Sequence, residues 1–195
     1  MRRAAVRTLD DPAQLSELSR SDPDSDVRDQ AAEALLTLAL RGETAERALQ
    51  AVASLTDAKQ LVAVARSAQL EAVSRAALAR LDDRKALGSV ARHGEHGAVR
   101  LEALMRLSDP SELQAVALKS PHREVALRAL EQLSLSTEEL NAVAAHARSP
   151  AAARRARVIL HERSGAAGAP AHPNTDRPRQ TRWCESVESL ARSTE

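Results

Sequence analysis

A leucine that recurs every 26 residues is the feature that most restricts the fold of this chain. It stands at Leu55, Leu81, Leu107 and Leu133 (81 − 55 = 26), each time at the end of a segment rich in Ala and Leu. A unit of this length cannot bury its apolar side chains alone, so stacked copies must supply the core between them. The spacing predicts a right-handed α-solenoid (armadillo-type superhelix) of about five or six helical hairpins.

The apolar residues are of the kind that helices use. Hydrophobic residues make up 43% of the chain, but there is no Phe or Tyr and only one Trp, so the core must consist of Leu, Ala and Val. These side chains suit closely packed helices, whereas strands favour β-branched and aromatic residues. The composition therefore predicts an all-α fold, and the repeats assign residues 1–163 to it.

Each unit contains two helices whose apolar residues fall at equivalent places. In the second helices these residues are spaced i, i+3 and i+4, as on one face of a helix. One residue is inserted before the last of these helices. The second-helix positions are Leu61, Val64 and Ala65, then Leu87, Val90 and Ala91, then Leu113, Val116 and Ala117, then Leu140, Val143 and Ala144. The first-helix positions are Val73, Ala77, Leu78 and Leu81, then Val99, Ala103, Leu104 and Leu107, then Val125, Ala129, Leu130 and Leu133.

The turn between the two helices carries a helix-capping residue. The oxygens of Asp57, Asp83, Asp109 and Ser136 stand where they can accept hydrogen bonds from the free N–H groups of the second helix, worth about 1 kcal/mol each. An acidic residue follows at the third helical position after Asp109 and Ser136, as in a capping box. A row of aspartates could also line a cation site, but capping explains the residue type, the position and the spacing together.

The C-terminal part departs from the repeat. A last helix is expected from Ala151 to Glu162. Residues 164–180 are rich in Gly and Pro and predict a disordered linker. Residues 181–195 again have a helical pattern, with the apolar residues Trp183, Val187 and Leu190 at i, i+4 and i+7. This amphipathic helix is a candidate partner-binding element. It could dock on the solenoid, bind another chain or begin a longer helical domain, and the last alternative best fits a chain that stops without a terminating signal.

The charge pattern argues against two classes of partner. The net charge is +1, with cations and anions interspersed, which disfavours electrostatic binding of nucleic acid or a membrane. The single Cys184 excludes an intrachain disulfide, and the sequence has no apolar run long enough to cross a bilayer. We therefore expect a cytoplasmic protein that does not bind membranes.

The sequence shows no catalytic constellation. His93, Glu95 and His96 could contribute to a metal site, but no further ligand is identifiable nearby. Cys184 has no paired base in the sequence, so a partly buried helix residue is favoured over a nucleophile. The prediction is a non-enzymatic protein with no catalytic residue, no cofactor and no metal.

Two arginines occupy one repeat position, Arg80 and Arg106 (106 − 80 = 26). A ladder of arginines could track a phosphate backbone, but the next unit has Gln132 there and the previous one has Ser54. Aromatic residues for base stacking are also absent from the repeats. We expect instead a solvated helix face on which arginines pair with the carboxylates of Glu102, Glu124 and Glu131.

Several short strings resemble a known family. Helix pairs with an Asp-Pro turn and a Val-Arg or Val-Ala start to the following unit resemble HEAT-like repeats. Three repeat strings resemble the N-terminal helical region of bacterial proteins in domain-of-unknown-function family 349, and the tail string is similar to the start of its long helical segment. The strings are Ser21 to Arg28, Ala98 to Leu104, Asp109 to Leu113, and Arg182 to Ala191. The resemblance implies a bacterial cytoplasmic protein without established chemistry, and it brings no catalytic residues.

The predicted function is a protein–protein interaction scaffold that uses the extended surface of the stacked second helices. Non-core positions of these helices are the candidate partner-binding residues: Lys59, Arg66, Lys85, Arg92, Gln114 and Lys119. Two alternatives remain open. One is a nucleic-acid-binding HEAT-like protein, and the other is a HEAT-like lyase acting on a bilin chromophore.

Overall fold

The structure is a computed structural model that describes residue 6 and residues 9–167. Within these residues it contains helices and connecting segments but no strand, which confirms the predicted all-α fold. Most helices are short, and α3 is the longest of those in the first half. They are α2 (Pro12–Ser21), α3 (Ser25–Arg41), α4 (Ala45–Ser54), α5 (Ala58–Ser67), α6 (Glu71–Ala79), α7 (Arg84–His93), α8 (Gly97–Met105), α9 (Pro110–Lys119), α10 (Arg123–Gln132), α11 (Thr137–His146) and α12 (Pro150–Ala167).

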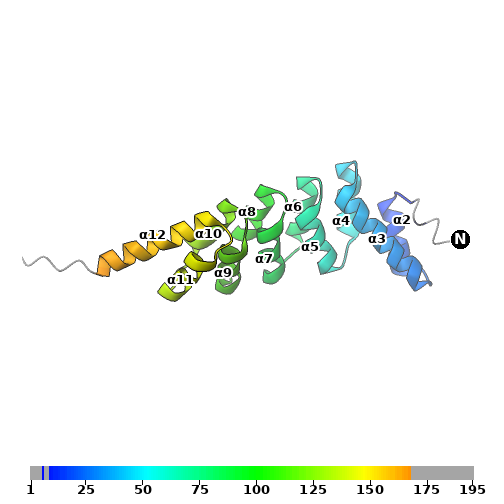
Figure 1. The fold of residues 1–195 in the computed structure, drawn as a ribbon. Coiled ribbons are helices and arrows are strands. Elements are labelled where there is room, and N and C mark those ends of the chain that lie inside the picture. The colour runs from blue at the N-terminus through cyan, green and yellow to red at the C-terminus, as the bar shows by residue number, and fades with distance from the viewer. Residues whose placement is uncertain (1–5, 7–8, 168–195) are drawn as a thin grey trace, which may run out of the picture.

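The helices form an elongated body of two rows (Figure 1). Each even-numbered helix from α2 to α12 contacts the next even-numbered one, and each odd-numbered helix from α3 to α11 contacts the next odd-numbered one. Across the rows, α5 packs most extensively on α6, α7 on α8, and α9 on α10. The closest pairs are therefore a second helix of one sequence unit and the first helix of the next unit.

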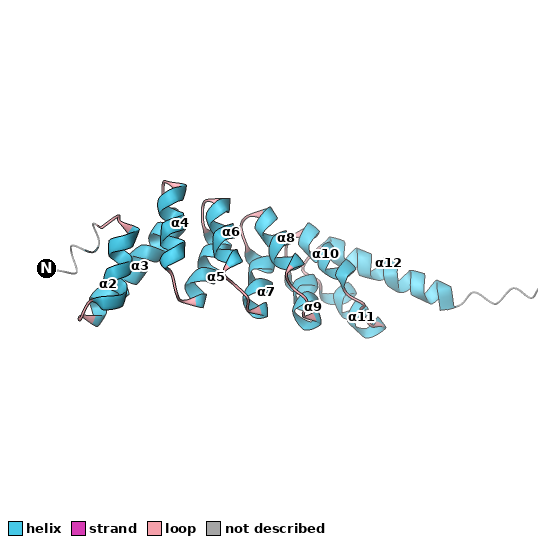
Figure 2. Cartoon of the chain, turned by 180° about the vertical axis from the view of Figure 1, so that it is seen from behind, coloured by secondary structure: helices cyan, strands magenta, loops and turns pink. Residues whose placement is uncertain are grey.

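The connections gather along two opposite edges of the body (Figure 2). We call one the cap edge, formed by the turns at 55–57, 80–83, 106–109 and 133–136 that lead into odd-numbered helices. We call the other the loop edge, formed by residues 42–44, 68–70, 94–96, 120–122 and 147–149, which lead into even-numbered helices.

The core consists of the Leu, Ala and Val side chains that the repeat predicts. All twelve second-helix positions are buried. The buried side chains form two clusters, one running from Val6 to Ala129 and one made by α10, α11 and α12. Leu133 packs against both clusters.

The recurring leucine is buried at Leu55, Leu81 and Leu107, but the prediction that Leu133 is an equivalent core residue is wrong in detail. Leu133 is only half-buried, whereas Leu135 is 4% exposed and belongs to the second cluster. The inserted residue explains the difference. It lengthens the turn before α11, so a leucine two positions later reaches the core.

The predicted N-caps are confirmed. The Asp57 carboxylate accepts a hydrogen bond from the Lys59 N–H (3.0 Å), and that of Asp83 accepts one from the Ala86 N–H (2.8 Å). The Asp109 carboxylate accepts from the Ser111 and Glu112 N–H groups at 2.9 and 3.2 Å. A complete capping box forms at Ser136 with Glu139. At Asp109 it does not form, because the Glu112 carboxylate pairs with Arg92 instead.

The loop edge is held by backbone hydrogen bonds between successive units. In each bond, an N–H group of one loop donates to a carbonyl oxygen near the end of the odd-numbered helix of the preceding unit. The bonds run from Gln69 to Leu40 (3.0 Å), from Glu95 to Arg66 (2.8 Å) and from Arg148 to Leu118 (2.8 Å). Pro121 stands at the place of Gln69 and Glu95 and has no N–H, so the corresponding bond to the Arg92 carbonyl oxygen cannot form.

The cap edge is held by arginine side chains. The Arg106 guanidinium donates to the carbonyl oxygens of Leu78 and Leu81, both at 2.6 Å, and so satisfies the C-terminal end of α6. Arg80 donates in the same way to Val52 and to Leu55, the latter at 2.7 Å, at the end of α4. The expectation of a solvated face is therefore wrong for these two arginines.

The final helix is longer than expected. It runs to Ala167, whereas the sequence predicted a helix end at Glu162 and a linker from residue 164. Ala166 and Ala167 are strong helix formers, and the Ser164 hydroxyl bonds back to the Leu160 carbonyl oxygen at 2.9 Å. The rest of the predicted linker and the predicted helix with Trp183, Val187 and Leu190 lie outside the described residues.

Replacing Arg106 tests the cap-edge bonds. We expect Arg106→Gln to lower the free energy of unfolding by about 2 kcal/mol, because two carbonyl oxygens lose a charged donor. The control is Arg84→Gln, which removes one ion pair of an arginine whose side chain is 72% exposed and should cost no more than about 0.5 kcal/mol. Urea unfolding measures both, and equal losses would contradict a special role for Arg106.

Asp109 should make stability depend on pH in the acid range. Hydrogen bonds, first from the Ser111 side chain and then from the Glu112 backbone N–H, lower the pKa of its carboxyl group from 3.8 to about 2. The unfolded chain then binds the proton more readily, so this stabilisation is complete above pH 4 and disappears as the pH falls towards 2. Urea midpoints across this window should fall more steeply for the wild type than for Asp109→Asn, and parallel curves would contradict the expectation.

Candidate interaction surface

The structure places the six described candidate residues on the odd-numbered row, in two separate groups. Lys59 and Lys85 are exposed in the first turns of α5 and α7, beside the cap edge. Arg66 and Arg92 are half-buried in the last turns of the same two helices, beside the loop edge. Seven helical residues span about 10 Å, so each lysine is two turns away from the arginine of its helix.

The remaining two candidates lie on α9. Lys119 is exposed at the end of this helix and belongs with the loop-edge group, whereas Gln114 is half-buried near its middle. The six residues therefore do not form one patch. The structure brings Arg66, Arg92 and Lys119 to one edge and leaves the two lysines at the other.

Between these groups the odd-numbered row presents small side chains. Ala63, Ser89 and Ala115 occupy one repeat position on α5, α7 and α9 (89 − 63 = 26), and all three are half-exposed. Side chains of this size leave room for another molecule to approach the helix backbones closely. The helix backbones of this row are therefore accessible to a docking partner.

The even-numbered row differs at α6 and α8, where charges are paired along the surface. The Arg75 guanidinium contacts the Glu71 carboxylate at 2.8 Å in its own helix and the Glu102 carboxylate at 3.1 Å in α8. The predicted pairing of arginines with Glu102 is confirmed at this residue. This network engages the charges of α6 and α8 with one another, whereas the exposed Arg123, Arg128 and Glu131 of α10 form no ion pair with another described residue.

Four residues that the sequence did not single out as binding residues add to the cations at the loop edge. They are His93 in α7, Arg100 in α8, His122 before α10 and Arg148 before α12. They come from loops stacked at a spacing close to 26 residues, and this register was the signal that could have found them. We call the group Arg66, His93, His122 and Arg148 the cationic cluster.

The electrostatics of the cluster show that its members are close neighbours. Burial, followed by the positive charges of Arg66, Arg92 and Arg148, lowers the pKa of the His93 imidazole below its usual 6.5. Burial also lowers the pKa of His122, assisted by Arg100, His93 and Arg148. Burial, and after it the neighbouring cations, thus disfavours the protonated form of both imidazoles.

The hydrogen bonds at this edge do not support a metal site formed by His93, Glu95 and His96. The His96 Nε2 atom lies 2.8 Å from the Ala68 carbonyl oxygen, while His93 is surrounded by arginines. Among the described residues, no group of three or more His, Cys, Asp or Glu side chains is arranged to hold a metal ion.

Arg92 is engaged within the odd-numbered row. Its guanidinium contacts the Glu112 carboxylate of α9 at 3.0 Å, with the two side chains only 16% and 19% exposed. Gly88 makes room for this pair, since a Cβ atom there would lie 2.5 Å from the Glu112 carboxylate oxygen. Arg92 therefore contributes charge to the surface but holds its own partner.

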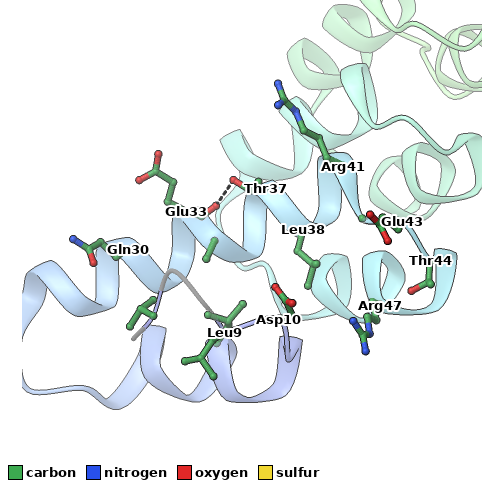
Figure 3. Close-up of a pocket in the computed structure, with 14 residues that line it drawn as sticks. Leu9, Asp10, Gln30, Glu33, Thr37, Leu38, Arg41, Glu43, Thr44 and Arg47 are labelled. Carbon is green, nitrogen blue, oxygen red and sulfur yellow. Dashed lines mark hydrogen bonds between the residues drawn. The ribbon is translucent and has the colours of Figure 1, made fainter. Parts of the chain in front are cut away.

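A groove of about 690 Å³ lies between α2, α3 and α4 (Figure 3). Leu9, Leu15 and Leu38 contribute apolar surface, and charged residues such as Asp10 and Arg47 line it as well. Neither His93 nor His96 lines this groove, so it does not coincide with the residues considered for chemistry.

The comparisons with known proteins give no family for this chain. No protein-family model matches it, and no curated protein or solved structure matches it either. No helix in the described part of the chain has the length and apolar character needed to cross a membrane.

A double-mutant cycle tests the buried pair of the odd-numbered row. We expect the Arg92→Gln and Glu112→Gln variants to show a coupling energy of about 1 kcal/mol, because this pair is largely shielded from water. The matched cycle on Arg75 and Glu102, whose side chains are 51% and 34% exposed, should give less than about half of that. Urea unfolding of the variants provides the energies, and a reversed order would refute the assignment.

Proposed function

We propose that this chain is a HEAT-like α-solenoid that serves as a non-enzymatic scaffold and binds another protein along its odd-numbered row. The two rows of stacked short helices, the 26-residue repeat and the shared core support the solenoid assignment. The proposal includes the cytoplasmic location and the resemblance to domain-of-unknown-function family 349.

The observation that carries the proposal is the line of small, half-exposed side chains on α5, α7 and α9, which differs from the bridged charges on the surface of α6 and α8. The even-numbered row uses Arg75 to bridge two carboxylates on its surface. The odd-numbered row has small half-exposed side chains at one repeat position and unpaired cations at both of its edges, among them Lys59 and Lys85. A repeated, closely approachable surface with free charges at its borders fits an extended protein ligand.

The nucleic-acid alternative is weaker, because the arginines that suggested it are engaged elsewhere. The guanidinium groups of Arg80 and Arg106 donate hydrogen bonds to carbonyl oxygens at the ends of neighbouring helices. The bilin lyase alternative would need a reactive pocket. The groove between α2, α3 and α4 is lined by carboxylates, arginines, threonines and apolar residues rather than by histidines.

Affinity purification with mass spectrometry tests the proposal. Ala63→Glu with Ala115→Glu places bulk and negative charge on the odd-numbered row, so proteins recovered with the wild type should be lost. The matched control is Ala53→Glu with Ala79→Glu, at exposed places on α4 and α6, which should keep those proteins. The proposal fails if no protein is recovered above a scrambled-surface control, or if both double variants lose the partners equally.

A further inference from the structure

Four stacked loops carry the cationic cluster in a fixed order. Backbone bonds tie the loop of Glu95 to the Arg66 carbonyl oxygen and the loop of Arg148 to that of Leu118, both at 2.8 Å. Helices stack at about 10 Å, so the loops from 68–70 to 147–149 extend over about 30 Å. The cluster is therefore a row along the loop edge, positioned by the backbone itself.

The side chains of the cationic cluster lack partners among the described residues. Those of Arg66, His93, His122 and Arg148 take part in no hydrogen bond or ion pair there, and the Nε atom of Arg66 is buried without an acceptor. An N–H donor removed from water and left unpaired is costly, and the other N–H groups of the half-buried Arg66 guanidinium have no described partner and can donate to a carboxylate from outside.

The helix ends at this edge add to the attraction for anions. Helices α8 and α10 begin here. The side chains of their N-cap residues, His96 and His122, accept no hydrogen bond from the N–H groups of the first turn. The free N–H groups of both first turns therefore face the loop edge together with the positive ends of the helix dipoles. Helix ends and unpaired side chains thus favour the same sign of ligand.

We propose that the cationic cluster of Arg66, His93, His122 and Arg148 binds a short acidic segment of the partner protein. This inference rests on the proposed scaffold function and names the chemistry of its partner. Carboxylates of an extended chain, about 3.3 Å apart per residue, can meet successive loops, so about ten residues cover the row.

A protein segment fits this row better than a nucleic acid does. The repeats contain no aromatic side chain on which bases could stack, since the only aromatic residue of the chain is Trp183. The chain has a net charge of only +1, and Glu95 and Glu124 lie on the same loops and first turns. A continuous phosphate backbone would meet these carboxylates, whereas a short acidic run can place its charges between them.

Binding should strengthen as the pH falls. Arg66, Arg92 and Arg148 surround His93, and Arg100, His93 and Arg148 surround His122, while Glu124 acts on Arg100. Burial and these cations both disfavour the protonated form of the two imidazoles. A bound carboxylate would raise the pKa of both groups, so binding takes up protons and is favoured at lower pH.

The test is fluorescence anisotropy of the full chain with a labelled polyglutamate peptide of about ten residues at low ionic strength. Arg66→Gln with Arg148→Gln should weaken binding about tenfold. Lys59→Gln with Lys85→Gln removes the same charge at the cap edge and should weaken it less than about threefold. No peptide binding, or equal losses for the two pairs, would overturn the proposal. Unchanged thermal unfolding by circular dichroism verifies that each variant is folded.

Two further arms separate the alternatives. The wild type should bind the peptide about threefold more tightly at pH 5.5 than at pH 7.5, and His93→Gln with His122→Gln should remove this difference; an unchanged difference would overturn the role of the histidines. A labelled single-stranded oligonucleotide of equal charge should bind more weakly than the peptide. If the oligonucleotide instead binds more tightly than the peptide, and Arg66→Gln with Arg148→Gln abolishes that binding, the ligand of the cationic cluster is a nucleic acid and not an acidic segment.

The failure of this inference differs from the failure of the scaffold function. If proteins recovered by affinity purification are lost with Ala63→Glu and Ala115→Glu but kept with Arg66→Gln and Arg148→Gln, the scaffold function holds and the cationic cluster is not its acidic-segment site. Peptide binding tests the cationic cluster directly, whether or not affinity purification recovers a partner protein.

Discussion

The structure depends on how it satisfies the carbonyl groups at its helix ends. A helix of about ten residues leaves four carbonyl oxygens without a partner in the helix, a large share of its backbone. Here the next unit supplies the missing donors, from Arg106 to the end of α6 and from the Glu95 N–H to the end of α5. No such unit completes its own ends, so each is stable only when stacked.

The two edges solve this problem by different means, and the difference decides which side chains remain for function. At the cap edge the donors are guanidinium groups, so Arg80 and Arg106 are consumed by the fold. At the loop edge backbone N–H groups supply donors together with Arg100 and Arg157, and the side chains of Arg66 and Arg148 are left over. Arginines without a hydrogen-bond partner therefore remain at the loop edge, while Lys59 and Lys85 are exposed beside the cap edge.

The sequence predicted the features that are local or strictly repeated. The caps at Asp57, Asp83 and Ser136 follow from a residue type next to a helix start, and the buried positions follow from the spacing of Leu, Val and Ala. Both signals act within a few residues or recur unchanged from unit to unit, and a single sequence is enough to read them.

The features that the sequence could not supply depend on neighbours about one repeat away. Arg106 resembles any exposed arginine until the carbonyl oxygens of Leu78 and Leu81 are placed beside it. The Glu112 carboxylate pairs with Arg92 and does not complete a capping box. This pairing depends on Gly88, which lies in another helix. The cationic cluster combines the ends of α5 and α7 with two loops, and no pattern within one unit contains it.

The junction between α8 and α10 lacks both kinds of tie that are present around α6. Pro121 has no N–H for the Arg92 carbonyl oxygen, and Gln132 stands where Arg80 and Arg106 reach the preceding unit. The core also passes there from one cluster to the other. At this point the even-numbered row is therefore held by side-chain packing without these two ties. His93 and His122 belong to the units on either side of this junction, so an acidic segment that binds both would supply a tie that the sequence omits.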